Sequence, residues 1–186
     1  MGTSKKPRQR KCVVCKTKFV PRFTTFQKTC NEAACILVHM QQEKANNERK
    51  AMVAMRERIK TPSQWRNELQ TIFNRWVRLR DKSLGCISCG RPLVGKYDAG
   101  HYYSVGAYPS LRYHPDNCHG QCVECNQHRH GNLIEYGERL IERIGPERLE
   151  ELKRLRREML RLTIPEMRDA IKTYKTKIKE LEHGYK

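Results

Sequence analysis

The sequence contains no long apolar stretch. No segment approaches the roughly 20 consecutive apolar residues that a helix needs to cross a bilayer, and the mean hydropathy is -0.83. An apolar run of signal-peptide length is also missing near the first residue, where Lys5, Lys6, Arg8 and Arg10 stand instead. We therefore expect no membrane contact and a reducing cytosolic setting, in which paired cysteines favour metal over disulfides.

Acidic residues are scarce relative to basic ones. The chain has 186 residues with 38 Lys and Arg against 20 Asp and Glu, a formal net charge of +18. Positive charges in such a chain repel one another. Proteins with this charge usually bind nucleic acid, because their Lys and Arg side chains neutralise phosphates and release counterions. Apolar content is only 38%, so one large core is not expected. Small sub-domains then need covalent or metal cross-links, or staples, to be stable. Composition predicts a nucleic-acid partner; a ribosome-associated or merely solubilised basic protein is the alternative.

Nine cysteines supply the candidate staples. Eight form two sets of closely spaced pairs: Cys12, Cys15, Cys30 and Cys35, then Cys86, Cys89, Cys122 and Cys125. Two such pairs can surround one tetrahedral Zn²⁺, and a zinc ion with four thiolate ligands has no open position for substrate. We predict two structural zinc sites. Cys118 is left over and is expected to be a buried apolar side chain.

Helix-capping residues, prolines and glycines, together with the spacing of apolar residues, predict a mainly helical α+β protein. Thr61, Pro62 and Gln64 have the pattern of a helix start with a capping box, and helices are expected again over 133–143, 146–160 and 163–182. The expected regions are an N-terminal zinc knuckle (1–38), a basic helical linker (39–60), a catalytic core with its preceding helix (61–132) and a C-terminal helical region (133–186).

Basic side chains gather around the first cysteine set and along the following helix. They are Lys11, Lys16, Lys18, Arg22, Arg49, Lys50, Arg56, Arg58 and Lys60. We expect them to contact DNA phosphates, which position a protein without reading sequence. A solvated charged face is the alternative interpretation.

Polar residues between and beside the second cysteine pairs have a distinctive spacing. The segments are DAGHYY (98–103) and DNCHGQCVECNQHRHGN (116–132). This pattern resembles the HNH or ββα-metal nucleases, in which two strands and a helix form a small treble-clef-like core around a divalent cation. The resemblance implies that His101 is the general base, that Asn117 orients its ring, and that Asn126 ligates a catalytic Mg²⁺ or Mn²⁺.

One position departs from the HNH pattern. Many HNH sites have an Asp or His metal ligand directly before the base, and here that residue is Gly100. Asp98 is the first candidate to complete the ligand set, and His119 and His128 are further candidates.

Longer phrases carry a second resemblance, to the phage NinG (Rap) recombination family. They are CISCG, DAGHY, LRY, NCHGQCVECNQHRHGNL and ERIG; the Cys-Asn ending is also similar to phage endonuclease VII. The resemblance implies a structure-specific endonuclease that cleaves Holliday junctions or D-loops in the bacterial host cytoplasm, as a homodimer and alongside phage recombination proteins. The alternatives are a non-catalytic zinc-finger nucleic-acid-binding protein and an HNH nuclease of ordinary duplex DNA.

Overall fold

The computed structural model describes residues 9–24 and 26–184. The chain divides into two compact units, Met1–Lys60 and Thr61–Lys186. Within the described residues, none of the helices combines the length and the apolar character that crossing a membrane requires.

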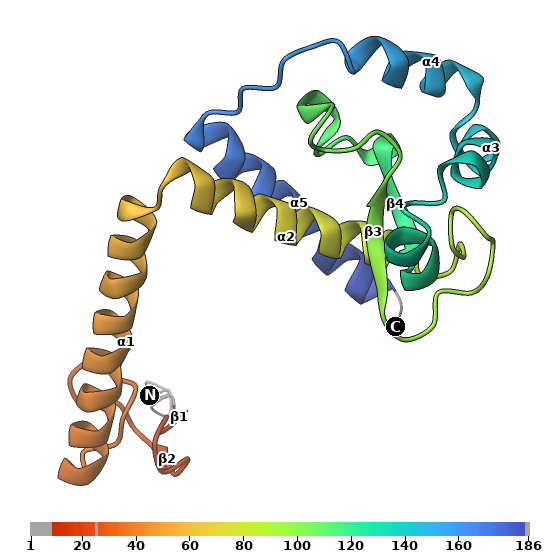
Figure 1. Ribbon diagram of the computed structural model, residues 1–186. Coiled ribbons are helices and arrows are strands. Elements are labelled where there is room, and N and C mark those ends of the chain that lie inside the picture. The colour runs from red at the N-terminus through yellow and green to blue at the C-terminus, as the bar shows by residue number, and fades with distance from the viewer. Residues whose placement is uncertain (1–8, 25, 185–186) are drawn as a thin grey trace, which may run out of the picture. The chain divides into compact units, whose positions relative to one another are not determined.

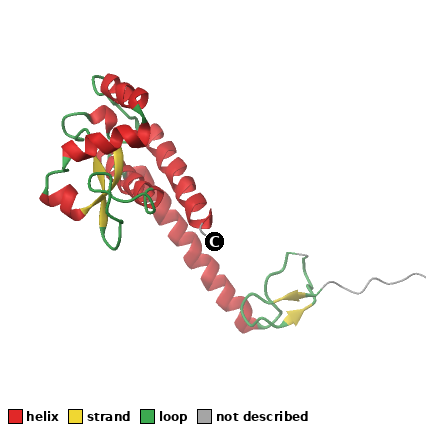
Figure 2. Cartoon of the chain, turned by 90° about the vertical axis from the view of Figure 1, so that its right-hand side faces the viewer, coloured by secondary structure: helices red, strands yellow, loops and turns green. Residues whose placement is uncertain are grey.

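The first unit is a small hairpin followed by a long helix. Strands β1 (Arg10–Lys11) and β2 (Lys18–Phe19) pair antiparallel, and a tight turn joins them in which Lys16 has a φ of +64°. Helix α1 (Ala33–Ile59) begins beside this hairpin (Figure 2). The expected knuckle and the expected linker therefore belong to one unit.

Helix α1 buries almost nothing along its length. Cys35, in its first turn, is its only buried residue. Apolar side chains farther along, including Met52 and Met55, are more than half exposed. Because an amphipathic stripe against a core stabilises most protein helices, α1 rests on its own propensity and on the cysteine set at its start.

The second unit is built on two long helices that lie side by side, α2 (Pro62–Arg80) and α5 (Ile164–Gly184) (Figure 1). The predicted start of α2 is confirmed, because Thr61 and Gln64 form a reciprocal capping box. The two helices bury a continuous apolar seam between them: Trp65, Leu69, Phe73, Trp76, Val77, Met167, Ile171 and Ile178.

A two-stranded antiparallel hairpin packs against α2. Strand β3 (Tyr97–His101) pairs with β4 (Cys118–Cys122), with His101 opposite Cys118 and Gly100 opposite His119. The connection contains two single turns, η1 (Pro109–Leu111) and η2 (Pro115–Asn117). After β4 the chain forms a π-helical turn, η3 (Glu124–His128).

Helices α3 (Leu133–Ile144) and α4 (Pro146–Leu155) form a second core in this unit. Their buried side chains surround Ile87, from the segment before the hairpin, and Leu111, from the connection between its strands. Gly145 separates the two helices with a φ of +81°. Helix α4 ends at Leu155, so the expectation that it reaches residue 160 was wrong. The hairpin is thus packed on one side by α2 and α5 and contacted on the other by α3.

Candidate functional site

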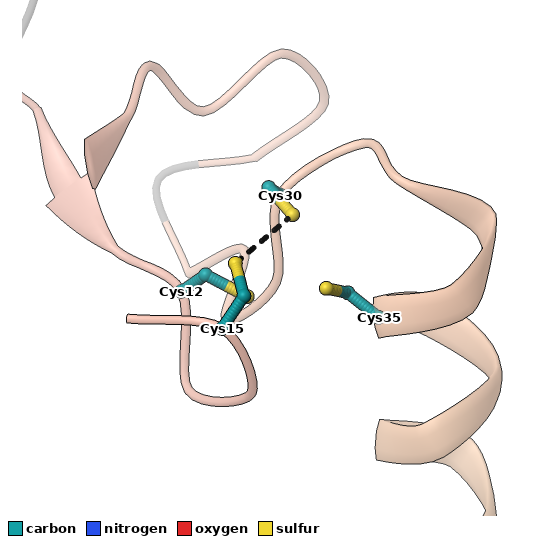
Figure 3. Close-up of side chains that lie close together, drawn as sticks. All are labelled: Cys12, Cys15, Cys30 and Cys35. Carbon is teal, nitrogen blue, oxygen red and sulfur yellow. Dashed lines mark hydrogen bonds between the residues drawn. The ribbon is translucent and has the colours of Figure 1, made fainter. Parts of the chain in front are cut away.

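The first cysteine set converges at the start of α1 (Figure 3). Cys12 directly follows β1 and Cys15 lies in the turn after it. Cys30 lies in the loop before the helix, and Cys35 lies in the first turn of α1. The backbone amide of Cys12 donates to the carbonyl of Thr17 at 2.9 Å, which closes the turn. The four sulfurs lie within 4.8 Å of one another.

The second cysteine set joins the segment before β3 to the end of β4 and the turn that follows it. Cys86 and Cys89 lie in a turn after α2, Cys122 ends β4 and Cys125 lies in η3, and their sulfurs again lie within 4.8 Å of one another. The guanidinium of Arg91 donates to the sulfur of Cys89 at 3.3 Å. Although burial acts in the opposite direction, this contact helps to lower the pKa of the Cys89 thiol to about 6.

Both sets have the dimensions of a zinc site. Thiolates that ligate Zn²⁺ at about 2.3 Å in a tetrahedron lie about 3.8 Å apart. The sulfurs of Cys15 and Cys30 are 3.8 Å apart, and so are those of Cys89 and Cys122. A disulfide requires about 2.05 Å, and all nine cysteines are free. Two cysteine clusters that can hold zinc are therefore a property of the fold, as the sequence predicted.

His101 closes β3 and is held at both ring nitrogens. Nε2 lies 3.0 Å from the carbonyl oxygen of Arg112, which can only accept, so the neutral ring carries its proton on Nε2. Nδ1 lies 3.7 Å from the thiol of Cys118, a weak donor. Burial lowers the pKa of His101 below its usual value. The ring is therefore neutral at pH 7, and Nδ1 is its acceptor.

The Asn117 amide is hydrogen-bonded to backbone groups and not to the His101 ring that it was expected to orient. Its amide accepts from the backbone nitrogen of Tyr103 at 2.8 Å and donates to the carbonyls of Tyr103 and Leu111 at 3.0 and 3.1 Å. These bonds fix the loop after β3 and also Leu111. The next residue is Arg112, and its carbonyl is the group that binds the histidine. Asn117 is a positioning residue that acts through the loop backbone.

Asp98 and Asn126 lie next to each other. The amide nitrogen of Asn126 donates to Asp98 Oδ2 at 3.0 Å, and the amide of Gln127 donates to the same oxygen at 2.7 Å. Carboxylate and amide oxygens are the ligands that Mg²⁺ and Mn²⁺ prefer. The fold therefore places the two expected oxygen ligands side by side, although 28 residues separate them in the sequence.

The structure explains the glycine that departs from the HNH pattern. A Cβ at Gly100 would lie 2.0 Å from Oε1 of Gln121, far inside contact distance. The Gln121 side chain is fully buried and donates to Ser88 Oγ at 2.7 Å and to the carbonyl of Gly131 at 2.6 Å. Gln121 fills the space that a side chain at residue 100 would need, so position 100 cannot supply a ligand.

His119 and His128 lie apart from this pair. His119 is 3% exposed and its Nδ1 lies 3.2 Å from the hydroxyl of Tyr136, which in turn donates to the carbonyl of Gly100. Its side chain is on the hairpin face opposite to that of His101, because the two residues differ by one in register. His128 is exposed. Among the described residues, only the two cysteine sets gather three or more His, Cys, Asp or Glu ligand atoms.

A cavity of about 870 Å³ opens beside the end of β3. His101 and Asn126 both line it, so the expected base and an expected metal ligand face one space. The loop after β3 and the first turns of α3 form much of the remaining wall. The other candidate ligands, Asp98, His119 and His128, do not belong to its lining.

Most of the basic residues expected at DNA are solvent-exposed in the first unit. Lys60 differs, because it is half-buried and pairs with Glu57 at 2.5 Å. The others lie on the hairpin, on the following loop and along α1; they are Lys11, Lys16, Lys18, Arg22, Arg49, Lys50, Arg56 and Arg58.

A buried ion pair that the sequence did not indicate braces the hairpin. Arg80 binds the carboxylate of Asp81 with two bonds of 2.6 and 2.8 Å and donates to the carbonyl of Cys118. The fully buried Asp81 accepts the amide of Gly120 at 2.8 Å. An Arg-Asp dipeptide at a helix end is an ordinary surface sequence, so only packing identifies it as structural.

These features define a basic protein with two tetracysteine clusters and a hairpin site. The family described as Bacteriophage Lambda NinG protein matches residues 4–184, and the chain belongs to this family. Protein ninG of Escherichia phage 933W is 35% identical over 195 residues, 96% of each chain. Protein ninG of Escherichia phage lambda is 40% identical over 68% of this chain and 61% of its own, and that of Salmonella phage P22 is 41% identical over 66% and 60%. No solved structure matches the chain.

Proposed function

We propose that this protein is an HNH-type endonuclease that hydrolyses phosphodiester bonds of branched DNA, such as Holliday junctions and D-loops, with a bound Mg²⁺ or Mn²⁺. The observation that carries the proposal is the shared cavity, which His101 enters from the end of β3 and Asn126 from the turn after β4. The adjacent tetracysteine cluster fixes the turn after β4 to the segment that precedes β3.

The state of His101 suits a general base. The Arg112 carbonyl holds the Nε2 proton, so Nδ1 is the atom that takes a proton from the attacking water. For this step the weak contact of Nδ1 with the buried thiol of Cys118, at 3.7 Å, would have to open to admit water. Burial lowers the pKa of His101, which keeps the base neutral to lower pH than a free imidazole.

Asp98 and Asn126 are the residues that would hold the catalytic cation. Both offer oxygen atoms, and the amide nitrogen of Asn126 is already bound to Asp98, which leaves the amide oxygen as its donor atom. A divalent cation at this place would stabilise the charge that develops on the phosphate oxygens. Gln127 shares Asp98 Oδ2 and fixes the orientation of the carboxylate.

Charge supports DNA as the substrate, and the resemblance to the NinG recombination family points to a branch. The net charge of +18 favours binding to phosphate at any sequence. Two-fold symmetric junctions present two strands for cutting, and a homodimer would bring one active site to each. Phage recombination proteins remain the expected partners.

The test compares wild-type protein with His101→Ala on labelled four-way junction, D-loop, splayed and linear duplex DNA at one salt concentration. Reactions contain Mg²⁺, Mn²⁺ or no added divalent metal; EDTA is avoided because it also competes for structural zinc. We expect metal-dependent cutting near the branch, and a loss of about 10²- to 10⁴-fold in the variant. Binding to the junction and two bound zinc ions per chain should persist in His101→Ala.

Three outcomes contradict parts of the proposal. Undiminished cutting by His101→Ala removes the base assignment. Equal cutting of linear duplex makes the protein a general or sequence-directed HNH nuclease. Tight junction binding without cutting under any condition leaves a non-catalytic zinc-finger protein.

A further inference from the structure

The wall of the cavity beside His101 is aromatic. Tyr102, Tyr103 and Tyr108, all from the loop after β3, line it and are half-buried. Ring centroids are 4.8 Å apart for Tyr102 and Tyr103 and 5.2 Å apart for Tyr103 and Tyr108, in edge-to-face arrangements. Leu133 and Ile134, at the start of α3, add aliphatic surface. A site for phosphate alone needs cations and amides, so this wall is suited to a flat apolar group.

The rings are held in place without any ligand. Asn117 binds both backbone polar groups of Tyr103, as described above. The Arg156 guanidinium lies 5.6 Å from the Tyr103 ring and 5.9 Å from the Tyr108 ring. Tyr102 packs close to α3 at Gly137, where a Cβ would lie only 3.1 Å from its hydroxyl. The loop therefore presents fixed rings with a cation beside them.

We propose that Tyr102, Tyr103, Tyr108 and Arg156 form a stacking platform for an unpaired DNA base, and that seating this base in the cavity brings the adjoining phosphodiester to His101. The inference rests on the proposed nuclease function and names the feature of the substrate that is recognised. Aromatic rings with neighbouring arginines bind bases of single strands with little sequence preference. The volume of about 870 Å³ is in the range of pockets that hold small organic groups.

The platform gives a physical reason for a preference for branches. In an intact duplex the neighbours in the stack cover both faces of a base, and extruding it costs a few kcal/mol. A base at a branch point has lost its stacking neighbour on one side, so it enters the cavity at lower cost. The protein would then select the structure of the DNA and not its sequence.

The test measures binding of the His101→Ala protein, without added Mg²⁺ or Mn²⁺, to two forked DNAs at one salt concentration. One carries a single unpaired thymidine at the branch, and the other carries an abasic residue there, which removes the base and keeps every phosphate. We expect the abasic fork to bind about 5- to 150-fold more weakly. Equal binding of the two forks overturns the platform.

Variants then assign the effect to the rings. Tyr103→Leu and Tyr108→Leu, made in the same His101→Ala background, keep an apolar side chain but lose the ring, so the preference for thymidine over the abasic residue should disappear. Tyr103→Phe and Tyr108→Phe should restore it. Thermal unfolding and zinc content verify that each variant folds.

A cross-linking measurement needs no change to the platform. A 5-iodouracil at the unpaired position, irradiated on the His101→Ala protein, should link to the 102–108 loop, and the same base placed within the duplex should link far less. Links that map only to other segments overturn the proposal. Because neither binding nor cross-linking requires cutting, a platform without nuclease activity and a nuclease without a platform give different results.

Discussion

The two units of this protein use the same ligand pattern in different ways. Among the described residues of Met1–Lys60 the cysteines are themselves the core, because Cys12, Cys30 and Cys35 are the buried apolar residues and only Val14 and Phe19 pack on them. In Thr61–Lys186 the second cluster adjoins two large apolar cores. Zinc is thus expected to fold the first unit and to anchor one end of a hairpin in the second.

Charge follows the same division. Residues 1–60 contain 15 Lys and Arg against 4 Asp and Glu, whereas residues 61–186 contain 23 against 16. The first unit therefore has a net charge of +11 and the second unit one of +7, although the first unit is less than half as long. A segment with so little core and so much charge is suited to following phosphates, while the better-packed unit can hold side chains at fixed distances for chemistry.

Removal of one thiolate should have the largest effect and should separate the units. Structural zinc supplies about 10–16 kcal/mol of apparent folding free energy in small zinc domains. We expect Cys30→Ser to abolish hydrogen-exchange protection throughout residues 9–60. Cys89→Ser should open the hairpin end and η3 while α2 and α5 stay protected.

Zinc content provides the control for this comparison. Wild-type protein should hold two zinc ions per chain and each of these variants one. Cys118→Ala, which changes a buried cysteine outside both clusters, should keep two. Retained protection of residues 9–60 in Cys30→Ser would contradict the view that zinc forms that unit's core.

The next largest effect should come from the apolar cores. Phe73 is fully buried between α2 and α5 and contacts the rings of Trp76, Tyr113 and Tyr174. Phe73→Ala should destabilise the second unit by about 3–5 kcal/mol in urea unfolding. Met52→Ala, at a 57% exposed position of α1, is the matched change in the first unit and should alter stability by less than about 0.5 kcal/mol.

Acidification should weaken the second unit through a buried histidine. Burial lowers the pKa of His119 from its usual 6.5 to about 3. Below pH 6.5 the unfolded chain therefore binds a proton that the native state does not, and stability falls by about 1.4 kcal/mol per pH unit down to the native pKa. Urea unfolding of wild type and His119→Asn between pH 7 and 5 should show a shallower slope in the variant; equal slopes would contradict this origin.

The smallest expected effect concerns helix starts. Thr61→Ala removes the oxygen that accepts from the amide of Gln64 and should cost about 1 kcal/mol in the second unit. Helix α1 has no side-chain cap at Glu32, so Glu32→Ala should leave the first unit nearly unchanged. The two variants can be compared by exchange protection in the first turn of each helix.

The sequence predicted features that depend on local spacing. Cysteine pairs separated by two or four residues predicted both clusters, because a short turn brings two thiolates to one metal wherever it occurs. The start of α2 was predicted in the same way, because a capping box depends only on residues that are close in sequence, here Thr61, Pro62 and Gln64. Helix α4 was overestimated, because beyond Leu155 the helical composition of the sequence has no buried face to support it.

Long-range packing decided the rest of the candidate site. Asn117 was expected at the histidine ring and instead binds the backbone of Tyr103, which lies 14 positions earlier in the sequence, so the contact depends on the path of the connection between β3 and β4. The side chain of Gln121 occupies the space in which a Cβ at Gly100 would lie. His119 faces away from His101 because a one-residue difference in register reverses the face of a strand.

By itself, the sequence determined the charge, the two cysteine clusters, the helix starts and the resemblance to the NinG family, since each depends on composition or on residues close along the chain. Only the tertiary structure brought Asp98 to Asn126, put His101 and Asn126 on one cavity and lined that cavity with tyrosines. The reason is physical: spacing within a turn is fixed by covalent geometry, whereas contacts across 28 residues are fixed by how the hairpin packs between two cores.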